Sequence, residues 1–137
     1  MRKRPFDIDW LCEQAIETGR AFGVDLSILD GFISLKLLDY VIERVHALKR
    51  HGLIQEDAAH NVATCLGAYL GEIMLRDKLE DKGFSWQLYE TGLPVLMDSD
   101  RENMASPISR VQKIILEDDA GSVIVYYKAF LFLLENP

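Results

Sequence analysis

The stretch Val62-Ala-Thr-Cys-Leu-Gly-Ala-Tyr-Leu-Gly-Glu-Ile-Met74 decides the fold of this chain. Its apolar side chains recur at helical spacing, so it lies within a helix predicted from Glu56 to about Asp77. Gly67 and Gly71 interrupt that helix, and each costs about 1 kcal/mol relative to alanine. Close approach of another backbone usually offsets such a cost. The sequence therefore predicts that a neighbouring segment packs directly on this helix.

Four further helices are predicted from apolar side chains at helical spacing and from residues typical of helix ends. Asp7 or Asp9 can cap the first of them, and Gly23 stops it near Phe22. For residues 123–134 a terminal strand pair is the alternative, because Val-Ile-Val-Tyr-Tyr favours strands. The four predicted helices cover about residues 7–22, 34–50, 106–116 and 122–135.

Two antiparallel strands are predicted between the third helix and the fourth. Residues 84–89 alternate with period two, residues 93–97 follow, and a turn joins the two segments near Gly92. A short strand is also permitted at residues 24–28, whereas residues 99–105 read as a polar loop. The predicted fold class is α+β, with about four to five helices packed on a small antiparallel sheet, a single layer of strands. Residues 1–137 are expected to form one domain.

Composition and charge narrow the classes of function. The chain has 15 basic and 22 acidic residues and a net charge of −7, which disfavours non-specific binding to nucleic acid. Its longest apolar stretch, Val123–Leu134, is shorter than the roughly 20 residues that a membrane-spanning helix needs. The basic N-terminus is not followed by an apolar run, as it would be in a signal peptide. A cytoplasmic protein that does not enter membranes is expected.

No residue pattern indicates catalysis, a metal site or a cofactor. Cys12 and Cys65 have no CxxC spacing, so a disulfide is not indicated. Since residues five apart on a helix diverge by roughly 140°, His60 and Cys65 should not meet. An exposed histidine and a buried thiol are expected instead. The three histidines, His46, His51 and His60, lack zinc-ligand spacing, and Asp98, Asp100 and Glu102 lack the distal Glu of a calcium loop.

Glu72 and the last helix carry the remaining functional signals. Glu72 lies beside the two glycines, where it could be a buried acid that anchors a ligand or a partner in a structural ion pair with Lys or Arg. The apolar surface of the last helix is broad and includes Val125, Phe132 and Leu133. Central burial of that helix is the favoured interpretation, and a homodimer made through it is the alternative.

Four features in order resemble a known family. They are Ser27-Ile-Leu-Asp30 leading to Ser34-Leu-Lys-Leu-Leu-Asp39, the helix segment Gly67-Ala-Tyr-Leu-Gly-Glu72, the strand around Trp86, and Pro107-Ile-Ser-Arg-Val-Gln-Lys113 ahead of a glycine and a final helix. From about Val24 to Leu134 the chain resembles small bacterial proteins of unknown function that share a Gly-x-Tyr-x-Gly-Glu helix followed by a Trp-containing strand. The apolar Gly31-Phe-Ile departs from the polar capping turn typical of this family.

The resemblance implies an α+β fold and brings no established activity. It singles out Tyr69, Gly71, Glu72, Trp86, Pro107 and Lys113. With it, we expect Glu72 and Lys113 to form a semi-buried ion pair beside the glycines, with Trp86 stacked over the pair. Tyr69, Glu72, Trp86 and Lys113 are therefore the candidate binding residues.

Two functions are compatible with these patterns. The first is a non-catalytic binding or protein-interaction module, immunity-type or regulatory, whose partner is another protein. It rests on the acidic surface, the missing catalytic set and the broad apolar last helix. The alternative is a small enzyme or ligand-binding protein that uses Glu72 in a pocket near Tyr69 and Trp86. No cofactor is predicted for either.

Overall fold

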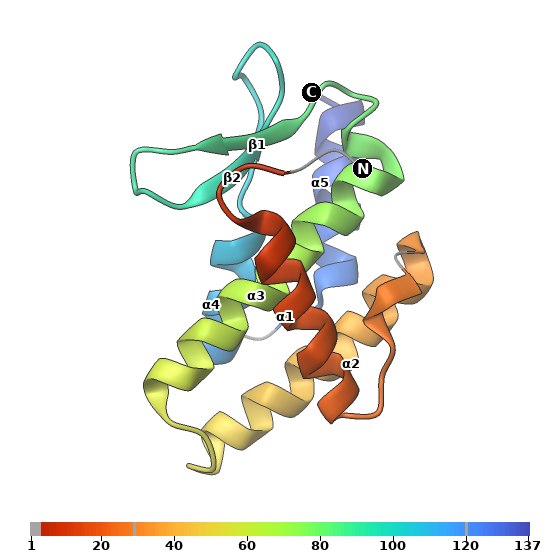
Figure 1. Cartoon of the computed structure of the whole chain (residues 1–137). Coiled ribbons are helices and arrows are strands. Elements are labelled where there is room, and N and C mark those ends of the chain that lie inside the picture. Colours follow the sequence, from red (N-terminus) through yellow and green to blue (C-terminus); the bar gives the residue numbers. More distant parts are fainter. Residues whose placement is uncertain (1–3, 29, 120) are drawn as a thin grey trace.

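The computed structural model describes residues 4–28, 30–119 and 121–137. In these ranges the chain forms five α-helices and a small three-stranded antiparallel sheet, which confirms the predicted α+β class (Figure 1). The helices are α1 (Ile8–Ala21), α2 (Gly31–Arg50), α3 (Glu56–Met74), α4 (Pro107–Leu116) and α5 (Val123–Glu135). The strands are β1 (Ser85–Leu88), β2 (Pro94–Met97) and β3 (Met104–Ala105), and η1 (Leu26–Ile28) and η2 (Leu75–Leu79) are a 3-10 and a π-helical turn.

Helix α3 is the centre of the molecule, with α1, α2 and α4 packed against it. Every residue from Cys65 to Met74 is buried. A Cβ atom on Gly67 would lie 2.4 Å from the Cα atom of Ile108 in α4, so only glycine lets the two backbones come this close. This close approach confirms the contact predicted from the glycine spacing.

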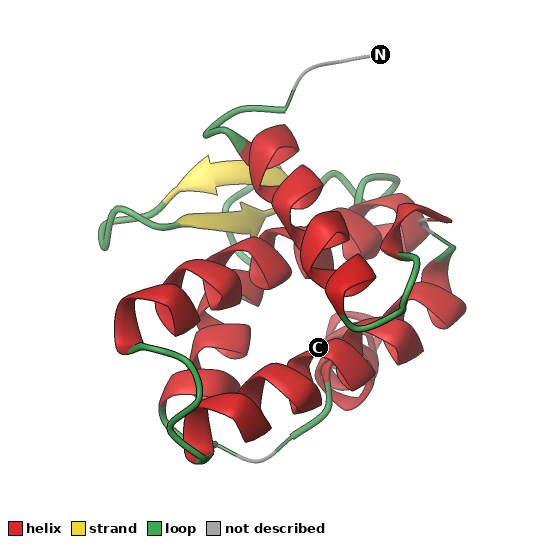
Figure 2. Cartoon of the chain, turned by 60° about the horizontal axis from the view of Figure 1, so that its bottom comes forward, coloured by secondary structure: helices red, strands yellow, loops and turns green. Residues whose placement is uncertain are grey.

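The sheet lies at one end of the helices (Figure 2). β1 and β2 pair antiparallel with Trp86 opposite Leu96, and β3 adds to the other edge of β2 with Ala105 opposite Leu96. The β1–β2 hairpin was predicted, but the β3 segment was predicted as loop. Two residues are too short to show a period of two, so no sequence pattern could reveal β3.

The short strand predicted at residues 24–28 is wrong, because η1 occupies this segment. The Asp25 carboxylate accepts hydrogen bonds from the backbone N–H of Ser27 at 2.9 Å and from its hydroxyl at 2.5 Å. Such a local bond bends the backbone into a turn and competes with an extended strand. The alternation of apolar and polar residues instead buries Leu26 completely in the core.

One predicted helix start differs from the structure, and at another the predicted cap lacks its side-chain hydrogen bond. α2 begins at Gly31 rather than near Ser34, and the Ser34 hydroxyl accepts a hydrogen bond from the N–H of Asp30 at 2.8 Å. Asp7 is the N-cap residue of α1, but its side chain makes no capping bond. Asp9 accepts a bond from the N–H of Arg4 instead, which fixes the chain segment ahead of the helix.

The C-terminal segment is helix rather than a strand pair, but the prediction that it is centrally buried is wrong. In α5 only Val123 and Tyr127 are buried. Val125, Phe132 and Leu133 are 64%, 63% and 65% exposed. The centre is already taken by α3, whose glycines and alanines let its neighbours pack closely around it, so α5 lies at the edge with one face outward. Within the described ranges, no helix is both long and apolar enough to cross a membrane.

Candidate functional site

Glu72 is a buried carboxylate with hydrogen-bond donors on both oxygens. It projects from α3 and is 5% exposed. Its Oε1 atom accepts a bond from Nε of Arg4 at 3.1 Å, and its Oε2 atom accepts one from the indole Nε1 of Trp86 at 2.9 Å. The Arg4 guanidinium also reaches Oε2 of Glu80 at 2.9 Å. A buried charge is tolerated when it is paired and hydrogen-bonded in this way.

The predicted ion pair between Glu72 and Lys113 is therefore wrong, because Arg4 takes the place of the lysine. Lys113 is exposed on α4. Trp86 donates a hydrogen bond to the carboxylate rather than stacking over an ion pair. The ring fits because residue 71 is glycine: a Cβ atom there would lie 2.3 Å from two of its carbons. The sequence did not predict Arg4 as the partner, because the basic N-terminal segment has no periodic pattern that would place it against α3.

Tyr69 is also bonded inside the protein. Its side chain is fully buried, and its hydroxyl donates to the backbone carbonyl of Leu26 at 2.6 Å. Burial raises the pKa of Tyr69 to about 12, so the phenol stays protonated. Of the four candidate binding residues, the structure joins Glu72 and Trp86, ties Tyr69 to η1, and leaves Lys113 on the surface of α4. Their role in binding stays a prediction.

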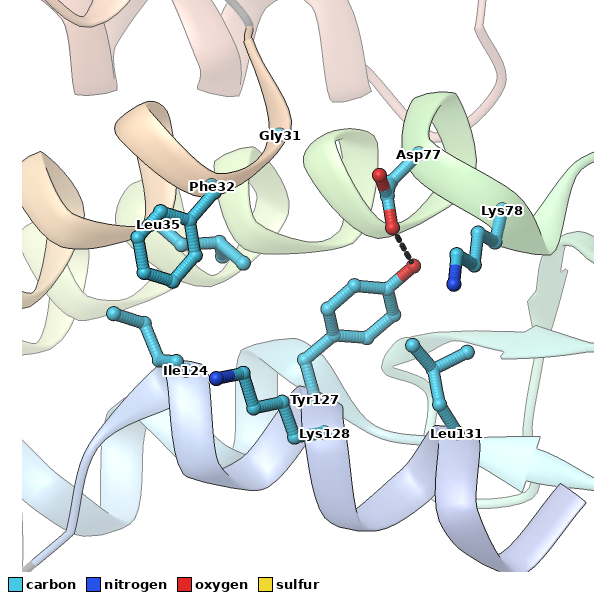
Figure 3. A pocket seen from close by; sticks show the side chains of 9 residues that line it. All are labelled: Gly31, Phe32, Leu35, Asp77, Lys78, Ile124, Tyr127, Lys128 and Leu131. Carbon is cyan, nitrogen blue, oxygen red and sulfur yellow. Dashed lines mark hydrogen bonds between the residues drawn. The ribbon is translucent and has the colours of Figure 1, made fainter. Parts of the chain in front are cut away.

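A second carboxylate of the same helical stretch lines a hollow that sequence reasoning missed. The hollow has a volume of about 270 Å³ and lies between the start of α2, η2 and α5 (Figure 3). Oδ2 of Asp77 accepts a hydrogen bond from the hydroxyl of Tyr127 at 2.6 Å. Burial and the neighbouring carboxylate raise the pKa of Tyr127, so the phenol remains the donor. The lining residues are Gly31, Phe32, Leu35, Asp77, Lys78, Ile124, Tyr127, Lys128 and Leu131.

Two lysines meet the exposed ring of Phe32 at the mouth of this hollow. The Nζ atom of Lys36 lies 5.5 Å from the ring centroid and that of Lys128 lies 5.4 Å from it. Such cation–π contacts hold the ammonium groups near the ring. Of the two, only Lys128 lines the hollow. No sequence pattern indicated this site, since its residues come from three segments far apart in the chain.

A larger groove of about 580 Å³ is lined by residues of α1 and of the first half of α3. Trp10, which is 57% exposed, lines it together with His60 and Cys65. His60 is exposed and Cys65 is buried, as predicted. Burial raises the pKa of the Cys65 thiol, which keeps it in the protonated, poorly nucleophilic form. Cys65 is therefore not an activated nucleophile.

The carboxylate of Asp98 stabilises a turn in the β2–β3 loop. Oδ1 of Asp98 accepts the backbone N–H of Glu102 at 2.9 Å, and Oδ2 accepts the side-chain amide of Asn103 at 2.9 Å. The bond from Asn103 is the main cause that lowers the pKa of Asp98. Among the residues that the structure describes, no three His, Cys, Asp or Glu side chains are grouped so that they could hold a metal ion.

Comparisons with protein-family models, with curated proteins and with solved structures found no match to this chain. The resemblance to small bacterial proteins with a Gly-x-Tyr-x-Gly-Glu helix thus stays a prediction.

Proposed function

We propose that this chain is a non-catalytic protein-interaction module, immunity-type or regulatory, whose contact surface is the outer face of α5. The observation that carries the proposal is the exposure of three large apolar side chains on that helix. Val125, Phe132 and Leu133 are each more than 60% exposed. An apolar surface of this kind gains free energy when a partner covers it, at about 25 cal/mol per Å² of buried area.

The exposed side chains form one face. At about 100° per residue, Val125, Ala129, Phe132 and Leu133 fall within an arc of roughly 100° around the helix. The helix is held at its N-terminal end: the hydroxyl of Ser122 donates to the carboxylate of Asp39 at 2.5 Å, and the N–H of Val123 donates to it at 2.8 Å. The face is thus presented by a helix that is already fixed, which reduces the entropy lost on binding.

A second copy of the chain is the partner that this face fits best. In an antiparallel pair of α5 helices with the two-fold axis at Ala129, Val125 of one copy lies opposite Leu133 of the other, because both are equally far from Ala129 in sequence. The small side chain at the axis lets the helices come close. Although the chain has a net charge of −7, α5 contains one lysine and one glutamate, so little repulsion acts across the pair.

Two further observations support a module without catalysis. Both oxygens of Glu72 already have donors, which weakens the alternative of an enzyme or ligand-binding protein built on that carboxylate. Burial raises the pKa of the Cys12 thiol as well as that of Cys65, so neither thiol is activated. The partner-binding role thus has more support than a catalytic one.

Sedimentation equilibrium of the full chain tests the proposal. A dimer that dissociates on dilution is expected for the native chain, and Phe132→Asp should shift it to monomer. Leu53→Asp is the matched control, since Leu53 is 73% exposed but lies in the turn between α2 and α3. A native chain that is monomeric at every concentration would refute pairing of α5. If, in addition, the same proteins are captured from host extract by the native chain and by Phe132→Asp, the contact surface is not α5.

A further inference from the structure

The hollow between α2, η2 and α5 presents charges of both signs above an apolar floor. Oδ1 of Asp77 accepts no hydrogen bond from any described residue, whereas Oδ2 is held by Tyr127. Lys78 and Lys128 form no ion pair with the described part of the chain. In this view they lie on either side of the Tyr127 ring (Figure 3). A carboxylate and two ammonium groups are therefore available to a ligand.

The floor of the hollow is apolar. Leu35 comes from α2, and Ile124 and Leu131 come from α5, with Phe32 beside them. The volume of about 270 Å³ falls just below the range of about 300–1,000 Å³ that drug-sized ligands occupy. The occupant should be smaller than a drug and should carry a compact apolar group. Charged groups at the mouth of an apolar hollow then fix its orientation.

We propose that this hollow binds a free α-amino acid with an apolar side chain. In this arrangement Asp77 takes the ammonium group, Lys128 and Lys78 take the carboxylate, and the side chain rests on Leu35 and Leu131. An anion without an amine would meet the charge of Asp77, and an amine without a carboxylate would meet the two lysines. A zwitterion satisfies both signs of charge in one site.

Gly31 keeps the carboxylate open to a ligand. A Cβ atom at this position would lie 3.0 Å from Oδ1 of Asp77, the oxygen to which no described residue donates. Glycine at the start of α2 therefore leaves space beside the atom that would bind the ammonium group. The inference does not rest on pairing of α5, because the exposed stripe of α5 and the hollow use different side chains of that helix.

Calorimetric titration of the full chain with L-leucine tests the proposal, at ligand concentrations up to about 10 mM, because a ligand of this size has few atoms with which to bind. Saturable binding is expected. The acid that lacks the amine, 4-methylpentanoate, and the amine that lacks the carboxylate, 3-methylbutylamine, should each bind at least about tenfold more weakly, as the loss of one charged contact predicts. No saturable binding of leucine, or equal binding of either analogue, would overturn the proposal.

Variants assign the binding to the hollow. Asp77→Asn keeps the shape of the side chain but loses its charge, and Lys128→Met keeps most of the stem, so each should weaken leucine binding at least about tenfold. Lys36→Met is the matched control. The ammonium group of Lys36 also lies over Phe32, but Lys36 does not line the hollow. The variant should therefore bind leucine with the affinity of the native chain. Native affinity in both Asp77→Asn and Lys128→Met would place the leucine elsewhere and refute the site.

Discussion

Glu72 and Asp77 are two carboxylates of one continuous helical stretch, and the structure uses them in opposite ways. Glu72 in α3 is 5% exposed, and donors from Arg4 and Trp86 occupy both of its oxygens. Asp77 in η2 is exposed, and Tyr127 occupies one of its oxygens. The first is a closed network that joins the N-terminus to the sheet. The second borders a hollow with room for a ligand.

A glycine makes space beside each carboxylate, and the use of that space separates the two regions. At Gly71 the ring of Trp86 fills it, so that the indole N–H reaches Glu72. At Gly31 the missing Cβ atom leaves space next to Oδ1 of Asp77, and no described residue donates a hydrogen bond to this oxygen. A saturated carboxylate stabilises the fold, whereas one with a free oxygen can bind a ligand.

The largest expected effect comes from removing the two carboxylates. Glu72→Ala leaves the Trp86 indole N–H without its acceptor and removes one of the two carboxylates that pair with Arg4, so the free energy of unfolding should fall by about 3–5 kcal/mol. Asp77→Ala should cost about 1 kcal/mol or less, because the Tyr127 hydroxyl faces a hollow that water can enter. Urea denaturation followed by circular dichroism measures both. Equal losses would erase the distinction between the regions.

Substitution of the two glycines gives the next largest effect. Gly71→Ala places a methyl group 2.3 Å from carbons of the Trp86 ring, and such overpacking should destabilise the fold by about 1–3 kcal/mol. Gly31→Ala meets only the carboxylate of Asp77, which can turn aside, so its thermal midpoint should stay close to that of the native chain. Differential scanning calorimetry compares the two variants. A large loss in Gly31→Ala would mean that the hollow is as tightly packed as the Trp86 site.

Removing the hydroxyl groups of Tyr69 and Tyr127 should give a smaller difference in the free energy of unfolding. Tyr69→Phe leaves the carbonyl of Leu26 in the core without its donor and should cost about 1–2 kcal/mol. Tyr127→Phe frees a carboxylate that water can solvate, so its cost should be below about 1 kcal/mol. Chemical denaturation at neutral pH resolves these values. The reverse order would show that Asp77, rather than the core around Tyr69, needs its hydrogen bond for stability.

The smallest effect is the dependence of stability on the ionisation of Tyr69, which is absent at neutral pH and appears only in alkaline solution. The pKa of Tyr69 is raised by burial from 10.0 to about 12, so the folded chain keeps a proton that the unfolded chain releases. The contribution of Tyr69 to stability is therefore complete below pH 10 and is lost as the pH rises toward 12. Denaturation midpoints measured against pH should show this fall, and Tyr69→Phe should make it shallower. An unchanged slope in the variant would contradict the assignment.

The sequence predicted the elements whose apolar residues recur with a regular period. Helical spacing located α3. The Gly67–Gly71 pair indicated a close neighbour, because a larger side chain at either position would collide with the packed segment. The hairpin followed from alternation around Trp86. Predictions failed where a single side chain decides the backbone, as Asp25 does in η1, and where a segment is too short for a pattern, as in β3.

The candidate site could be predicted only in part, because side-chain partners come from distant segments. The sequence indicated that Glu72 needs a basic partner, but it could not distinguish Arg4 from Lys113, since nothing periodic places the N-terminus against α3. The hollow at Asp77 joins α2, η2 and α5, and its residues are unremarkable one at a time. The outward face of α5 was only the alternative prediction, because a broad apolar helix is compatible with central burial as well as with a partner surface.

Two-dimensional 15N NMR of the full chain during titration with L-leucine tests the central distinction most directly. The chain has two tryptophans, so the indole N–H of Trp86 gives a separate signal that reports on the Glu72 network. We predict that leucine shifts the backbone amides of Leu35, Asp77 and Lys128 in a saturable way while the Trp86 indole signal stays in place. A saturable shift of the Trp86 indole signal, with no change at those three amides, would contradict the account.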